Sequence, residues 1–208
     1  MSKNTATATV RVVDHDVAEP PRPDDLAKLS APLTAVLTAE LDEAGRYLEA
    51  STHELILGAL GRTIARTIGT GAVAVDLVGG GAVQVDCTTV RQASATKALR
   101  AVHRTLAAGP RRGSARSDIL FSCIDVEPQP PYWQTLPSGG HPLELRVYRG
   151  GGVLQMDWWY DTRWLDPYTV EELTEQFPLA LIELTSEAAP LEATEVAVVH
   201  DGFALADR

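Results

Sequence analysis

Five histidines are the side chains best suited to chemistry, because a neutral imidazole can accept a proton from a reacting group near neutral pH. His15 is followed by Asp16, whose carboxylate could orient the imidazole, although the pair could also simply end a strand. His200 precedes Asp201 and Gly202, a pattern more typical of a turn that ends a strand. His15, His200 and Asp201 are the candidates for general acid–base work, and spacing alone assigns none of them as catalytic.

The remaining histidines and the two cysteines do not suggest a metal site. His53 stands at the start of a predicted helix and His103 lies beside Arg104 within another, so we expect both to face solvent. No histidine pair has acidic neighbours at ligand spacing, and Cys87 and Cys123 form no CxxC motif. We predict no metal, no bound cofactor and two reduced, buried thiols.

Two segments could contact a phosphate. The triple glycine at residues 79–81 follows a predicted strand, but no Lys-Ser or Lys-Thr pair follows it, so a plain turn is favoured. Arg111, Arg112 and Arg116 cluster in a segment that also contains glycine and serine. We expect this segment to be a solvated connector, with a local anion contact as the alternative.

An aromatic-rich strand is predicted at residues 154–160, where apolar residues alternate with other side chains. Trp158 and Trp159 must point to opposite faces, so one belongs to the core and the other could be exposed. An exposed tryptophan beside Tyr160 and Trp164 would anchor a protein partner. The alternative is that helices cover both faces of the sheet, and the sequence does not separate the two. The candidate partner-interface residues are Trp158, Trp159, Tyr160 and Trp164.

Hydrophobic periodicity and capping residues predict the elements that position these side chains. Ser51 and Glu54 form a capping box at the start of one helix, and Arg62 is expected on its outer side. Asp166 and Pro167 are a cap residue and a first-turn proline, which predict the start of another helix. The predicted helices cover residues 33–48, 51–68, 94–108 and 167–184. The predicted strands cover residues 7–13, 72–77, 83–87, 119–124, 143–148, 153–160 and 196–199.

The mixed order of strands and helices predicts an α+β fold in which helices pack on a largely buried sheet as a two-layer α/β sandwich. With 208 residues the chain is long enough for one sizeable core. We divide it into an N-terminal strand and proline-rich connector at 1–30, one domain at 31–188 and a tail at 189–208 that holds the last predicted strand.

Composition argues against two classes of partner. The net charge of −10, with no basic stripe to offset it, argues against binding of nucleic acid. No apolar run approaches the roughly 20 residues of a membrane span, and the first residues contain no hydrophobic signal core. We therefore expect a cytoplasmic protein that does not act at a membrane.

Three segments, in this order, resemble a known family: STHELILGALGRTIARTIGTGAVAVDLVGGG at 51–81, SDILFSCID at 117–125 and LQMDWWYDTRWLDPYTVEELTEQFPLALIEL at 154–184. They are similar to the C-terminal half of a nonribosomal peptide synthetase condensation or epimerization domain. The resemblance implies half of a chloramphenicol acetyltransferase-like fold. No single motif carries it, whereas the order and spacing of all three do.

The departures from the family concern its active site. The catalytic HHxxxDG motif, which belongs to the N-terminal half of the family, is absent from this sequence. Where the epimerization type has the glutamate, histidine and arginine of an EGHGR turn, this chain has Val78, Gly80 and Ala82. Of the family's FNYLG strand only Phe121 is retained, and the segment at 86–94 is shortened. The resemblance thus implies a fold and a pathway, but it does not imply that the family's active-site residues are present in this chain.

Two functional hypotheses follow from the resemblance. The first is a non-catalytic half-domain that acts in assembly, docking or completion of a split domain in nonribosomal peptide or polyketide biosynthesis. Its partner would be a synthase module, a carrier protein with its phosphopantetheine arm, a complementary half-domain or a second copy of the chain. The alternative is a minimal acyltransferase- or cyclase-type enzyme that acts on a carrier-bound or small acyl substrate, with a histidine as general base.

Overall fold

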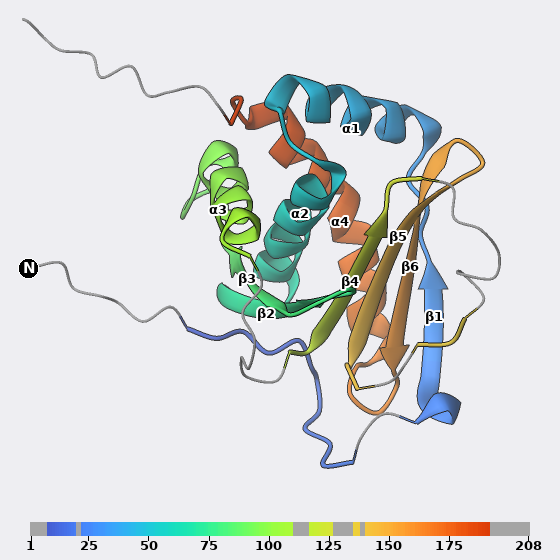
Figure 1. The fold of residues 1–208 in the computed structure, drawn as a ribbon. Coiled ribbons are helices and arrows are strands. Elements are labelled where there is room, and N and C mark those ends of the chain that lie inside the picture. Colours follow the sequence, from blue (N-terminus) through green and yellow to red (C-terminus); the bar gives the residue numbers. More distant parts are fainter. Residues whose placement is uncertain (1–7, 20–21, 110–116, 127–134, 138–139, 192–208) are drawn as a thin grey trace, which may run out of the picture.

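Six strands form one mixed sheet in the computed structural model, which describes residues 8–19, 22–109, 117–126, 135–137 and 140–191. The order across the sheet is β1-β6-β5-β4-β2-β3 (Figure 1). The strands are β1 (Leu26–Ser30), β2 (Gly71–Leu77), β3 (Ala82–Cys87), β4 (Ile119–Ile124), β5 (Leu143–Gly150) and β6 (Val153–Asp161).

Strand β4 runs parallel to both of its neighbours, and the other pairs are antiparallel. In register, Val75 of β2 lies opposite Ile119 of β4, which lies opposite Leu143 of β5. Strands β5 and β6 form the predicted hairpin, whose turn places Gly151 and Gly152 at φ angles of 61° and 80°. Glycine is suited to this left-handed region because it has no Cβ to clash with the backbone.

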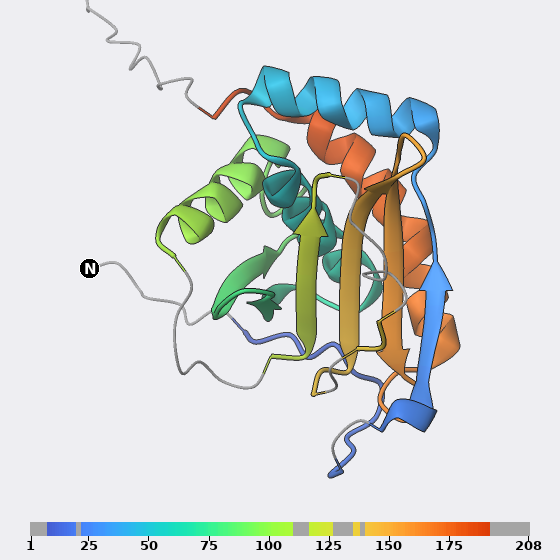
Figure 2. The ribbon, with the colours of Figure 1, turned by 45° about the vertical axis from the view of Figure 1, so that its right-hand side comes forward.

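Four α-helices complete the described part of the fold, with a short 3-10 helix, η1 (Pro23–Asp25), before β1: α1 (Ala35–Leu48), α2 (Thr52–Thr67), α3 (Ala95–Ala107) and α4 (Pro167–Glu187). Helices α2 and α4 pack together behind the sheet, α1 crosses above them, and α3 lies beside β3 (Figures 1 and 2). The front face of the sheet carries no helix among the described residues. The predicted α+β, two-layer sandwich is therefore confirmed.

Helix α2 is the central helix of the core, and its start is defined locally. The backbone N–H of Ser51 donates to Glu54 Oε2 at 2.6 Å, and the N–H of Glu54 donates to Ser51 Oγ at 3.3 Å, completing the predicted capping box. From there twelve of the 16 helix residues are buried.

In the part of the chain that the structure describes, none of the helices combines the length and the apolar character that a membrane span requires.

Two predictions are wrong, and one strand of the structure is not among the predicted elements. Residues 8–13 do not form a strand, since only Thr9 makes an isolated bridge to Ala72. Strand β1 is not predicted, because its five residues, three of them half-buried and two exposed, carry no strong alternation of apolar and polar types. Arg62 does not face away from the core: its side chain is 1% exposed and donates to the carbonyl oxygens of Thr88 at 2.6 Å and Ala93 at 2.5 Å. The predicted strand at 196–199 lies outside the described residues.

Candidate functional site

A cavity of about 190 Å³ lies where β2 leaves the sheet beside β4. The N–H of Val78 donates to the carbonyl oxygen of Phe121 at 3.0 Å, as the last link between the two strands. The turn at residues 79–81 then carries the chain away toward β3, with all three glycines at positive φ. The lining residues are His53, Leu77, Val78, Phe121, Ser122, Cys123 and Ile124.

His53 is exposed, as predicted, and brings an ionisable group to the edge of this cavity from the first turn of α2. Its ring meets the Phe121 ring edge-on, with centroids 5.8 Å apart and planes at 87°. Burial lowers the pKa of His53 below its ordinary value, and the nearby carboxylates of Asp125 and Glu54 only partly oppose this. The imidazole is therefore neutral at neutral pH and is able to accept a proton.

Cys123 brings a thiol to the same cavity from β4. Burial, reinforced by the negative charge of Asp125, raises the pKa of Cys123 to about 12. The group is thus a neutral thiol at neutral pH, whereas nucleophilic attack requires a thiolate. With a neutral imidazole, a neutral thiol and apolar side chains around it, the cavity suits an uncharged ligand group.

The rim of the cavity is held by a charged cluster that joins four elements. Asp125, after β4, accepts hydrogen bonds from Thr52 Oγ1 at 2.6 Å and from Arg149 Nε at 2.8 Å. Arg149 of β5 also pairs with Asp42 of α1. Burial alone would raise the pKa of Asp125, but these hydrogen bonds hold it below its ordinary value. The carboxylate therefore stays charged and fixes the start of α2, and His53 with it.

The helix-free face of the sheet holds a second polar cluster. Asp157 is buried, accepts a hydrogen bond from Ser30 Oγ at 2.5 Å and lies 3.5 Å from Lys28 Nζ. The ring of Trp159 lies between Lys28 and Arg146, whose charges are 5.4 and 5.7 Å from its centroid. These charges are satisfied within the chain, so we interpret the cluster as structural.

Of the sequence candidates for acid–base chemistry, the structure describes His15, which does not line the cavity. His15 is half-exposed, and its Nε2 lies 3.1 Å from Asp166, the residue before α4, instead of being oriented by Asp16. His200 and Asp201 lie outside the described residues. His103 is exposed, as predicted, and its Nδ1 also lies 2.6 Å from Glu54 Oε1.

The aromatic residues expected at a partner surface are mostly inside the protein. Trp158, Tyr160 and Trp164 are buried, and Trp158 packs edge-on against Phe177 of α4 with ring centroids 5.7 Å apart. Three of the four proposed anchors are therefore unavailable to a partner, and for Trp158 the covering element is α4. Only Trp159, half-buried on the helix-free face, remains near solvent.

Sequence reasoning missed His53 as a site residue, although a signal was present. The EGHGR-like turn and the FNYLG-like strand were both identified, yet no pattern in the chain says that they meet. Once Val78 and Phe121 are hydrogen-bonded neighbours, the capped start of α2 places His53 over them. Among the described residues, no group of three or more His, Cys, Asp or Glu side chains could hold a metal ion.

A known polyketide synthase subunit shares sequence with this chain. No model of a known protein family matches the chain. A subunit of the phenolphthiocerol/phthiocerol polyketide synthase of Mycobacterium tuberculosis is 35% identical over a match that covers 93% of this chain. The chain spans only 17% of the length of that relative.

Solved structures share the fold at low sequence identity. The epimerization domain from the third module of tyrocidine synthetase B has a TM-score of 0.70 at 15% identity, and the match covers 88% of this chain and 53% of that one. The EpoB cyclization-docking bidomain of a nonribosomal peptide synthetase from Sorangium cellulosum has a TM-score of 0.65 at 14% identity, covering 88% and 45%. The chain therefore has the fold of condensation and epimerization domains, as its sequence resemblance implied, and it spans about half of those chains.

Proposed function

We propose that this chain, which has the condensation/epimerization fold, serves nonribosomal peptide or polyketide biosynthesis as a non-catalytic half-domain. Its role would be to complete, dock or assemble a larger synthase unit. One observation carries the proposal: the turn at Val78 and the strand at Phe121 meet at a cavity that no aspartate, glutamate, lysine or arginine among the described residues lines. Positions that hold a glutamate, a histidine and an arginine in the epimerization type hold Val78, Gly80 and Ala82 here.

The surface around the cavity supports an interface. The side chain of Val78 is 60% exposed although it is apolar and borders the cavity. A single exposed valine is ordinary on a protein surface, and Val36 is more exposed still, so it is the recess beside Val78 that makes this surface a candidate interface. The solved neighbours are about twice as long as the part that this chain matches, so a complementary half-domain is the partner we favour.

A carrier protein would be a second kind of partner at the same cavity. The amide and thiol end of a phosphopantetheine arm is uncharged, so it would suit the neutral lining formed by His53, Phe121 and Cys123. A second copy of the chain is the third kind. These occupants differ in mass, so one measurement separates them.

The test mixes this chain with the complementary half of a condensation domain from the same biosynthetic system. Size-exclusion chromatography with light scattering then measures the mass of any complex. We expect a one-to-one complex with the wild-type chain. Val78→Asp should weaken it at least about tenfold, because a carboxylate without a partner would be desolvated in the interface. The matched control is Val36→Asp, which changes an exposed valine in the first turn of α1.

Two results would contradict the half-domain proposal. One is a clean monomer in the presence of the complementary half, of the carrier protein and at high concentration. The other is unchanged binding by the Val78→Asp variant, which would place the interface elsewhere. A complex with the carrier protein alone, or a homodimer, would identify the other occupants and reject the split domain.

A second candidate function is a minimal acyl-transfer or cyclising enzyme, and the position of His53 favours it specifically. A neutral imidazole in a small, partly buried cavity is a suitable general base. His53→Gln keeps a polar side chain of similar size but removes the proton acceptor of suitable pKa. Loss of product in a reconstituted synthase, with binding retained, would establish the enzyme and reject the non-catalytic role. His15→Ala, far from the cavity, should leave product formation unchanged.

A further inference from the structure

Helix α3 is the cationic part of an otherwise acidic protein. Residues 87–117 contain seven of the 18 lysines and arginines of the chain and none of its 28 acidic residues. Three of these cations, Lys97, Arg100 and Arg104, lie on α3 itself. A concentration of one charge sign on one helix creates a local positive potential although the net charge of the chain is −10.

The packing of α3 leaves these cations on its outer side. Ala95, Leu99 and Val102 are buried against the rest of the fold, whereas Lys97 and Arg104 are exposed. Among the described residues, neither Lys97 nor Arg104 forms an ion pair with a carboxylate. Both cations are therefore accessible to an anionic group from outside the chain.

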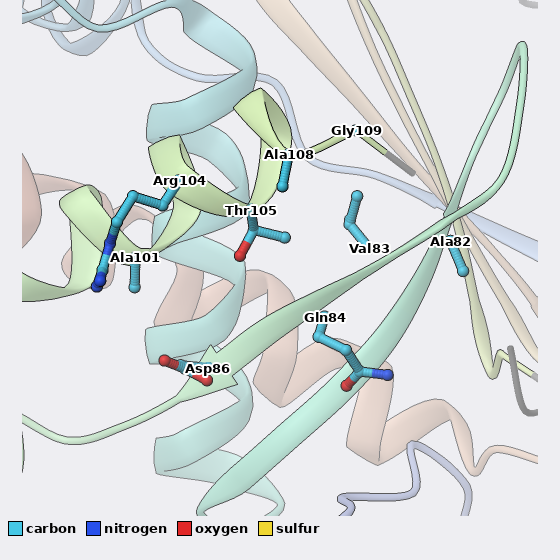
Figure 3. Close-up of a pocket in the computed structure, with 9 residues that line it drawn as sticks. All are labelled: Ala82, Val83, Gln84, Asp86, Ala101, Arg104, Thr105, Ala108 and Gly109. Atoms are coloured by element: carbon cyan, nitrogen blue, oxygen red, sulfur yellow. The ribbon is translucent and has the colours of Figure 1, made fainter. Parts of the chain in front are cut away.

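A groove lies on each flank of α3. The first, of about 310 Å³, separates α3 from β3 and is bordered by Ala101, Arg104 and Thr105 on the helix and by Gln84 and Asp86 on the strand (Figure 3). The second, of about 600 Å³, is bordered by Lys97, Arg100 and Leu191, and again by Arg104. The helix is thus a cationic ridge between two recesses.

We propose that the α3 ridge is a docking surface for an acidic protein segment. Lys97 and Arg104 are seven residues apart, which is about 10 Å along a helix at 1.5 Å per residue. A single small anion cannot bridge that distance, whereas carboxylates spaced along a helix or loop can contact both cations and enter the flanking grooves. A long nucleic acid would extend beyond the ridge onto the acidic remainder of the chain, beginning with Asp86 in the first groove.

This inference does not depend on the proposed function. The α3 ridge and the cavity at Val78 involve different residues, so each surface can be disrupted separately. If both are interfaces, the chain connects two partners, which would suit an assembly role. If only one of the two surfaces is an interface, the experiment on that surface still gives a positive result when the other experiment fails.

The test uses a helical peptide of about 18 residues with glutamates at positions i, i+3 and i+7, and a control peptide with glutamines instead. Fluorescence anisotropy should show binding of the glutamate peptide to the whole chain, weakening as salt rises. Arg104→Glu should weaken binding about fivefold or more, because it removes one charge pair and adds a repulsion. Circular dichroism checks that the variant is folded.

The chain offers a matched control in Arg46. Arg46 and Arg104 are both exposed, lie in the last turn of their helices and donate from Nε to the carbonyl oxygen four residues earlier, at 3.3 and 3.2 Å. Arg46→Glu changes the net charge equally, so it should leave peptide binding unchanged. Equal weakening by both variants would overturn the proposal, since the effect would then come from net charge alone.

Two further outcomes would also overturn it. One is absence of binding by the glutamate peptide at low salt. The other is equal or tighter binding of a DNA duplex or of phosphatidylglycerol vesicles, which would assign the ridge to a nucleic acid or a membrane. Preference for the glutamate peptide over both, lost in Arg104→Glu and kept in Arg46→Glu, would establish an acidic protein as the occupant.

Discussion

The contact between α2 and β3 can be tested at one glycine. A Cβ added at Gly61 would lie 2.6 Å from the carbonyl oxygen of Asp86 and 3.0 Å from Cγ1 of Val85. Ordinary contacts begin near 3.4 Å, so a methyl group would overlap the strand backbone by about 0.8 Å. Because that backbone is paired with β2, the strain cannot be relieved by turning a side chain.

We expect Gly61→Ala to lower the free energy of unfolding by about 2 kcal/mol. Overpacking in a core costs about 1–3 kcal/mol, and a clash with a backbone oxygen belongs at the upper end. Alanine recovers about 1 kcal/mol of helix propensity over glycine. A net loss of about 2 kcal/mol corresponds to a fall in Tm of roughly 4–8 °C for a chain of this size.

Gly58, one turn earlier in α2, provides the control. There the added Cβ would lie 2.7 Å from Cδ2 of Leu184, the end of a flexible side chain. A rotamer adjustment costs about 0.5–1.5 kcal/mol, which the helix propensity of alanine largely offsets. Gly58→Ala should therefore change stability by less than about 0.5 kcal/mol.

Urea denaturation of the two variants and the wild type, followed by circular dichroism at 25 °C, measures these differences. If the Gly61→Ala variant is as stable as the wild type, or if Gly58→Ala loses more stability than Gly61→Ala, the fixed backbone of β3 does not decide the free-energy cost of the added methyl group. The consequence for function is direct, because α2 also carries His53. A helix pushed away from β3 should also change binding at the cavity.

Two other residues give clear expectations. Trp158→Ala should destabilise the fold by about 3–5 kcal/mol, because its side chain is 0% exposed between the sheet and α4; Trp159→Ala, on the helix-free face, should cost measurably less in the same urea experiment. Glu54 is buried, which alone would raise its pKa, but hydrogen bonds from Ser51 and His103 hold it below its ordinary value of 4.5. Its contribution to stability is therefore complete above pH 4.5 and is lost as the pH falls through the lower, folded pKa. Glu54→Gln should reduce the stability difference between pH 7 and pH 3, and an unchanged pH profile would contradict this.

Much of the secondary structure could be predicted because its signals are local. The Ser51–Glu54 capping box begins α2 as predicted, and Asp166 with Pro167 begins α4. The hairpin of β5 and β6 follows from two alternating segments around a glycine turn. Strand β1 escaped prediction because an edge strand with half-exposed residues lacks the alternation of a strand with one buried face.

Side-chain environments were harder to predict, and the errors share a cause. Arg62 lies on a helix that is covered on all sides, so helical periodicity could not identify an outer face for it. The two tryptophans of β6 were known to face opposite ways, but which one entered the core depended on where α4 packs. Both outcomes depend on contacts between segments far apart in the sequence.

The sequence by itself determined most of the elements, the capping box of α2, the family resemblance and the loss of the family's charged side chains at positions 78–82. Each depends on residue identities or on hydrogen bonds between near neighbours in the chain. Only the tertiary structure decided that Val78 and Phe121 meet beside His53, and that partial desolvation there lowers the pKa of this imidazole. Desolvation and cavity shape arise where distant segments pack together, and spacing along the chain does not specify them.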